Sequence, residues 1–106
     1  MDKKIKSVLL ELKTKLEGLY GARLNGVYLF GSYARNEADE ESDVDILIVL
    51  DRVDSYSEEI TLSSEIISEI SLKYGITLSR VFASKRQWLE DPTLFFLNVR
   101  EEAIPA

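Results

Sequence analysis

The sequence contains no cysteine and no histidine. Without these residues the chain has no thiol nucleophile, no disulfide, no serine–histidine catalytic pair and no zinc site built on cysteine or histidine. Catalysis by this chain would have to use carboxylates, lysine, arginine, tyrosine, hydroxyl groups or a metal ion. No apolar run reaches the length of a membrane-spanning helix, and the N-terminal segment is amphipathic rather than a signal sequence. We therefore expect a cytoplasmic protein that does not associate with membranes.

Positive charge is also scarce. The chain carries 13 Lys and Arg against 19 Asp and Glu, a net charge of −6. Binding to DNA or RNA depends on basic side chains that contact phosphates, so we expect no nucleic-acid partner. A length of 106 residues with 45% hydrophobic composition suits a small globular protein, and we expect residues 1–106 to form a single domain.

Hydrophobic spacing predicts how helices and strands alternate along the chain. We expect, in order, a helix from about Lys3 to Leu19, a strand at Leu24–Phe30, a strand at Val44–Leu50, a helix from about Ser55 to Tyr74 and a strand at Ile76–Ala83. Gly21 and Gly75 are typical helix ends. Ser84 is expected to cap a short helix over residues 85–90, and Asp91 a further helix that begins at Pro92. Leu94, Phe95, Leu97 and Val99 could close the core or form an interaction surface.

The first candidate site lies where the strand ending at Phe30 meets Gly31. A glycine allows a sharp turn and a close approach of a ligand to the backbone. Ser32 could cap a short helical turn, whose free N–H groups favour phosphate. Arg35 would lie on the same side of such a turn as Ser32. Gly31, Ser32 and Arg35 are therefore candidate phosphate-binding residues.

The second candidate site is the acidic pair Asp43 and Asp45. Side chains alternate along a strand, so the two carboxylates share one face. They open the run 46–50, which is apolar on both faces and predicts a buried strand. Their mutual repulsion would be relieved by a divalent cation, and oxygen ligands suit Mg²⁺. A phosphate-binding turn beside a metal-binding carboxylate pair is what phosphoryl-type transfer requires.

Each half of this pattern also has an ordinary structural interpretation. Gly31 and Ser32 could form a simple turn, and Asp43 and Asp45 could be solvated acids at a strand end. The combination at this spacing, between two strand-like runs, favours a functional site. A calcium-binding EF-hand is excluded because residues 39–45 lack its glycine and its downstream glutamate.

Gly31-Ser32-x-x-Arg35 followed by Ser42-Asp43-x-Asp45 resembles the signature of the DNA polymerase β-like nucleotidyltransferase superfamily, in particular the minimal nucleotidyltransferases. The resemblance implies an α/β (α+β) fold, a small mixed sheet with helices packed mainly on one face. It also implies that Asp43 and Asp45 are catalytic and hold Mg²⁺, and that Gly31, Ser32 and Arg35 bind the nucleotide.

The same resemblance implies a Mg²⁺-dependent transferase that moves AMP from ATP onto an acceptor hydroxyl. Small members of the family often act as antitoxins of HEPN-type toxins, so the expected partners are a nucleoside triphosphate and a HEPN protein. Active members usually carry a third carboxylate on the third strand, but residues 76–83 contain none. Thr77 or Ser79 could occupy the equivalent place, and neither can act as a charged base near neutral pH. The alternative is a catalytically degenerate module that binds nucleotide or partner. The acceptor and the oligomeric state, including a homo-oligomer, stay open.

Overall fold

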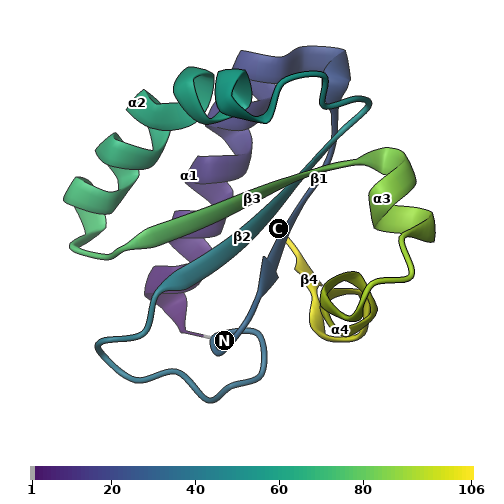
Figure 1. The fold of residues 1–106 in the computed structure, drawn as a ribbon. Helices are drawn as coiled ribbons and strands as arrows, with labels where there is room; N and C mark the ends of the chain where they lie inside the picture. Colours follow the sequence, from purple (N-terminus) through teal and green to yellow (C-terminus); the bar gives the residue numbers. More distant parts are fainter. Residues whose placement is uncertain (1) are drawn as a thin grey trace.

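The computed structural model describes residues 2–106 as a four-stranded sheet with helices on both faces (Figure 1). The strands lie in the order β3-β2-β1-β4; β1 is antiparallel to β2 and to β4, and β2 is parallel to β3. The elements are α1 (Lys3–Tyr20), a 3₁₀ turn (Gly21–Arg23), β1 (Leu24–Phe30), β2 (Val44–Leu50), α2 (Tyr56–Tyr74), β3 (Leu78–Ser84), α3 (Lys85–Glu90), α4 (Leu94–Glu102) and β4 (Ile104–Pro105). This is the mixed sheet that the sequence predicted.

The two long helices cover one face of the sheet, and their ends follow from local chemistry. The Asp2 carboxylate accepts hydrogen bonds from the first backbone N–H groups of α1, and Ser55 caps α2 in the same way. Gly21 ends α1, and Gly75 ends α2 in the left-handed conformation, with φ of 64°. These starts and stops confirm the predicted helices within a residue or two.

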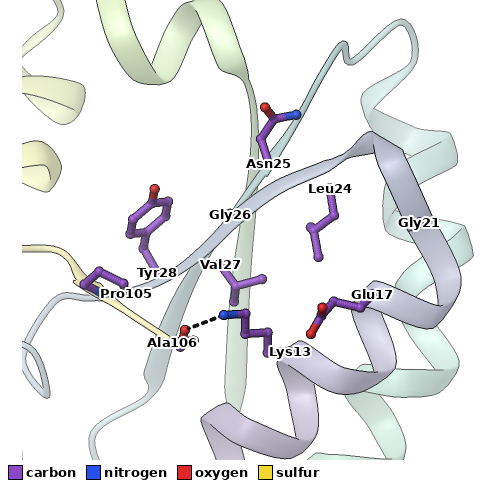
Figure 2. A pocket seen from close by; sticks show the side chains of 10 residues that line it. All are labelled: Lys13, Glu17, Gly21, Leu24, Asn25, Gly26, Val27, Tyr28, Pro105 and Ala106. Atoms are coloured by element: carbon purple, nitrogen blue, oxygen red, sulfur yellow. Dashed lines mark hydrogen bonds between the residues drawn. The ribbon is translucent and has the colours of Figure 1, made fainter.

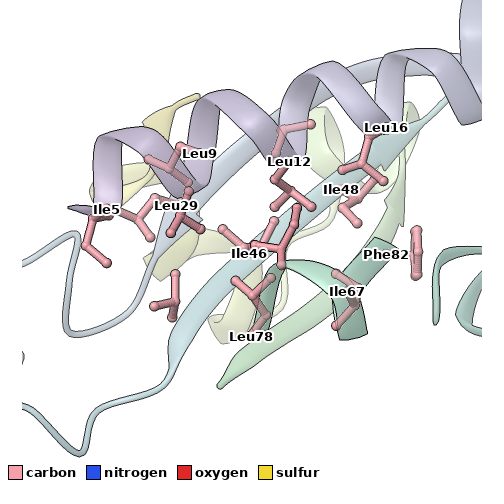
Figure 3. Close-up of a cluster of buried hydrophobic side chains, with 14 of the residues drawn as sticks. Ile5, Leu9, Leu12, Leu16, Leu29, Ile46, Ile48, Ile67, Leu78 and Phe82 are labelled. Atoms are coloured by element: carbon pink, nitrogen blue, oxygen red, sulfur yellow. The ribbon is translucent and has the colours of Figure 1, made fainter. Parts of the chain in front are cut away.

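Strand alternation divides the core into two layers. Ile46, Ile48 and Leu50 point toward α1 and α2, where they join the larger hydrophobic cluster with residues such as Leu12 and Leu16 (Figure 3). Leu47 and Val49 point the opposite way and pack against Phe96 and Val99 of α4. The long helices therefore lie mainly on one face, as predicted, while the short C-terminal helix α4 covers part of the other (Figure 1).

The structure corrects two predicted boundaries. The third strand begins at Leu78 rather than at Ile76, because the Ile76 N–H still donates to the Ser71 carbonyl and closes the end of α2. The last helix begins at Leu94 rather than at Pro92. Asp91 ends α3, and its carboxylate accepts a hydrogen bond from the Thr93 N–H at 2.9 Å, so it does not cap α4.

Two outcomes concern the C-terminal part. The short strand β4 was not predicted; it adds Ile104 and Pro105 to the free edge of β1. The apolar residues expected either to close the core or to form an interaction surface fall into two groups. Val99 is buried and belongs to the core, whereas Leu94, Phe95 and Leu97 are exposed. Within residues 2–106, none of the helices combines the length and the apolar character that crossing a membrane requires.

Candidate functional site

The turn after β1 is built around Gly31. Its φ of 76° lies in the left-handed region, where glycine is favoured. The Arg35 N–H donates to the Gly31 carbonyl at 3.1 Å, and the Glu37 N–H donates to the Ser32 carbonyl at 2.9 Å. The predicted helical turn is thus present as one hydrogen-bonded turn rather than a helix. Ser32 makes no side-chain capping hydrogen bond in the described part of the chain.

Asp45 lies directly against this turn. It is the second residue of β2 and pairs in register with Phe30, the last residue of β1. A Cβ atom placed on Gly31 would overlap the Asp45 carboxylate oxygen Oδ2 and would lie 3.0 Å from its Cγ. A larger residue at position 31 would therefore push the Asp45 carboxylate out of its present position.

The Asp45 carboxyl titrates above its ordinary range. Burial raises the pKa of Asp45 first, and the charge of Asp43 raises it further, while the Arg35 guanidinium opposes both effects. Asp43 precedes β2 and is exposed. The predicted pair is therefore asymmetric, with one half-buried acid held against the turn and one acid in solvent. A half-buried acid beside a second carboxylate is an arrangement that a cation stabilises.

Four of the predicted site residues line one hollow of about 390 Å³. It is lined by Phe30, Gly31, Ser32, Arg35, Asp45, Phe95, Asn98, Val99 and Glu102. Asp43 is not among the lining residues, although its charge acts on Asp45. The end of β1, the start of β2 and one side of α4 thus border a shallow, open hollow in which a ligand would meet both the turn and the acid.

The residues present fit a magnesium ion in part. Asp43 and Asp45 supply two carboxylates, and magnesium sites often use one or two carboxylates completed by water and substrate phosphates. Across residues 2–106 no group of three or more Asp or Glu side chains is arranged to hold a metal. Burial and the Asp43 charge raise the pKa of Asp45, and the Arg35 guanidinium offsets only part of that rise.

The third strand offers no acid to this site. Ser79 is the register partner of Asp45 in the parallel ladder between β2 and β3, so a hydroxyl stands beside Asp45 there. Arg80, one residue on, points to the opposite face. Its guanidinium donates to the Ser63 hydroxyl and the Ile60 carbonyl of α2, both at 2.8 Å. Arg80 therefore does not line the hollow, and it connects β3 to α2.

Sequence reasoning missed Glu102, the last residue of α4. Its carboxylate oxygen Oε2 accepts a hydrogen bond from the Gly31 N–H at 2.5 Å. The Arg35 guanidinium donates from Nη1 to both carboxylate oxygens, at 3.1 and 3.2 Å. No local signal marks this glutamate, because it follows another glutamate near the end of an ordinary amphipathic helix and is 71 residues away from Gly31.

A second hollow, of about 440 Å³, lies between α1 and the other end of β1 (Figure 2). Lys13 crosses it to donate a hydrogen bond to the Ala106 carbonyl at 3.0 Å, and Glu17 is the one carboxylate that lines it. None of the predicted site residues reaches this hollow. The hollow beside Gly31 is therefore the candidate site.

The chain was compared with known protein families. A family model described as a nucleotidyltransferase domain matches residues 5–92. The matched range includes Gly31, Ser32, Arg35, Asp43 and Asp45, and it ends before Glu102.

Similarity to individual proteins agrees with the match to the nucleotidyltransferase domain. A protein of Methanocaldococcus jannaschii with the name "Putative protein adenylyltransferase MJ0604" is 40% identical over 95% of this chain and 92% of its own length. The protein adenylyltransferase MntA of Thermococcus cleftensis is 36% identical over 70% of this chain and 73% of its own. A crystal structure of a toxin–antitoxin with AMP-PNP matches with a TM-score of 0.62 at 18% identity, over 89% of this chain and 68% of that chain, and so supports the fold.

Proposed function

The chain belongs to the nucleotidyltransferase domain family, and on that premise we propose that it is a protein adenylyltransferase that moves AMP from ATP to a hydroxyl group. The observation that carries the proposal is the convergence of Gly31, Ser32, Arg35 and Asp45 on one hollow. Two relatives of similar length carry the name protein adenylyltransferase, one of them as a provisional name. The proposed substrate is therefore ATP and the proposed acceptor a protein side chain.

The reaction is a substitution at the α-phosphorus of ATP. The acceptor oxygen forms a bond to the α-phosphorus, the bond from that phosphorus to the bridging oxygen breaks, and pyrophosphate leaves with the electron pair. The acceptor hydroxyl loses its proton to solvent or to a carboxylate. The chain's own contribution is to hold the triphosphate on the Gly31–Ser32 turn and to orient it toward the acidic pair at the start of β2.

Asp43 and Asp45 are the residues that would hold Mg²⁺. When bound, the ion neutralises phosphate charge and favours departure of pyrophosphate. Arg35 is exposed at the rim of the hollow and can supply a second positive charge once its present glutamate partners give way. In this proposal Ser32 contributes its hydroxyl and the backbone of its turn, and Gly31 contributes the close approach that its missing side chain permits.

The proposed biological role is that of an antitoxin that modifies or neutralises a helical HEPN-type toxin. Its support is the toxin–antitoxin assembly to which a fold neighbour belongs. A second fold neighbour is a toxin–antitoxin that includes MntA, the name that the Thermococcus relative carries. The net charge of −6 fits a protein partner rather than a nucleic acid.

A second candidate function is a binding module without transferase activity. The observation that favours it is Ser79, which stands in register with Asp45 on the strand where the resemblance implies a third carboxylate. Such a module would neutralise its partner by contact, with or without a bound nucleotide.

One experiment separates these functions. Titration calorimetry with ATP and Mg²⁺ is compared between the wild type and the Asp43→Asn/Asp45→Asn variant, and both are then incubated with the coexpressed partner. Mass spectrometry reads addition of AMP to the partner. Metal-dependent ATP binding and AMP addition, both lost in the variant, support the transferase. Partner binding without AMP addition, unchanged in the variant, contradicts it and supports the module.

A further inference from the structure

We propose that Glu102 is a built-in occupant of the phosphate-binding turn, which a nucleoside triphosphate must displace in order to bind. The proposal rests on the nucleotide-binding function proposed above and adds a control to the same site. It concerns a residue of α4 that lies outside the range matched by the family model.

The Glu102 carboxylate makes the contacts that a phosphate group would make. It accepts the Gly31 N–H, the backbone donor at the start of the turn. Both of its oxygens receive the Arg35 guanidinium. The Glu102 side chain is only 19% exposed, so these contacts hold the carboxylate against the turn rather than in solvent. An anion of the chain itself already satisfies two donors that border the hollow, the Gly31 N–H and the Arg35 guanidinium.

A triphosphate and the Glu102 carboxylate cannot share these donors. The Gly31 N–H offers one hydrogen, and a second anion placed there would face like charge from Glu102 as well as from Asp45. Repulsion between anions grows as water is excluded from the space between them. Binding of the triphosphate therefore requires that the Glu102 side chain rotate out of the corner and release Arg35.

Two features of the position of Glu102 favour such a movement. It is the last residue of α4, where the partial negative charge of the helix end disfavours a carboxylate. Its place is held by tertiary contacts to Gly31 and Arg35 rather than by its own helix. Arg35 also pairs with Glu37 at 3.3 Å, so it keeps a partner after release.

The experiment measures ATP affinity by titration calorimetry in the presence of Mg²⁺ for the wild type, Glu102→Gln, Glu102→Ala and Glu101→Gln. Glu102→Gln keeps the size and one acceptor oxygen but removes the charge. Glu101→Gln is the matched control, because Glu101 is the exposed neighbour on the same helix turn. We expect both Glu102 variants to bind ATP about tenfold more tightly, and Glu101→Gln to match the wild type.

A second measurement follows the contact itself. In ¹⁵N-labelled protein the Gly31 amide signal should shift when Glu102 is replaced by alanine, because the hydrogen bond to a carboxylate is lost. Addition of ATP to the wild type should move the same signal again as the phosphate takes over the donor. Thermal melting of each variant checks that the fold is retained.

The outcomes distinguish the two proposals. If the wild type binds ATP and Glu102→Gln binds it equally well or more weakly, Glu102 anchors α4 to the turn, and the displacement proposal is overturned while the nucleotide site stands. If the Glu102 variants bind and the wild type does not, the displacement proposal is supported in its strongest form. If none of the four proteins binds ATP, the nucleotide-binding function itself fails, and displacement fails with it.

Discussion

Asp45 of β2 and Ser79 of β3 are register partners in the parallel ladder, and their side chains leave the sheet on the same face. Neighbouring strands lie about 4.8 Å apart, so a carboxylate at position 79 would stand next to Asp45. The first prediction is that Ser79→Asp strengthens Mg²⁺ binding by about tenfold, because a third oxygen ligand joins the acidic pair.

The matched control for that prediction is Ser79→Asn, which has the same shape without the charge. Mg²⁺ affinity is read by calorimetry and transferase activity by release of pyrophosphate. Equal metal affinity in Ser79→Asp, Ser79→Asn and the wild type would mean that position 79 does not belong to the metal site.

The second prediction concerns the left-handed glycine of the turn. Gly31→Ala places a methyl group against the Asp45 carboxylate and forces alanine into a φ of 76°. We expect the free energy of unfolding to fall by about 2–4 kcal/mol, from backbone strain together with displacement of the acid. Binding of Mg²⁺ and ATP should be lost as well.

Gly75→Ala provides the control, since Gly75 has φ of 64° and an added Cβ would meet no atom within 4 Å. Gly75→Ala should lower the free energy of unfolding only through backbone strain, by about 1 kcal/mol, and leave ligand binding intact. Urea denaturation of both variants gives the comparison, and equal losses at the two positions would contradict the packing of Asp45 on Gly31.

The third prediction follows from the raised pKa of Asp45. Because burial and the charge of Asp43 raise this pKa, the folded protein holds the proton more tightly than the unfolded chain does. The stabilising contribution of the protonated acid is present below the unfolded pKa and is lost as the pH rises through the higher folded pKa. At neutral pH without metal, Asp45→Asn should therefore raise the melting temperature by a few degrees.

The gain in melting temperature should vanish at about pH 3, where Asp45 of the wild type is protonated as well. Added Mg²⁺ should stabilise the wild type and not the variant. Melting curves at the two pH values, with and without Mg²⁺, provide the test. A variant that melts at or below the wild-type temperature at neutral pH would show that the acid is not under strain.

The fourth prediction concerns a buried charge far from the hollow. Glu59 of α2 is only 4% exposed, pairs with Arg23 and leaves its oxygen Oε1 without a hydrogen-bond partner. Arg23→Ala would remove the compensating charge from this buried carboxylate. We expect a loss of about 2 kcal/mol in the free energy of unfolding, less than for a fully buried pair because the Arg23 side chain is 46% exposed.

Arg52→Ala is the matched control, because Arg52 pairs with Asp54 on the surface, where both side chains are about four-fifths exposed. Its removal should change stability by less than about 0.5 kcal/mol. Chemical denaturation of the two variants is sufficient, and a Glu59→Gln change that rescues Arg23→Ala would identify the buried charge as the cause.

Much of the fold could be predicted because its signals are local. The helices that end at Gly21 and Gly75 and the strands Leu24–Phe30 and Val44–Leu50 depend on periodicity and on turn residues, and both are written in neighbouring positions. The predicted boundaries were wrong where the hydrogen bond of a residue belongs to the adjacent segment of the chain. Ile76 completes the preceding helix, and the Asp91 carboxylate accepts the Thr93 N–H instead of opening α4.

The motif can be identified from neighbouring residues alone: a glycine turn after one strand, an acidic pair at the start of the next, and no acid on the third strand. Three relationships exist only in the folded chain: Asp45 packs on Gly31, Ser79 pairs in register with Asp45, and Glu102 occupies the turn. The reason is physical. Turn and strand preferences act within a few residues, whereas strand register and the packing of α4 depend on how apolar faces are buried across the whole sheet.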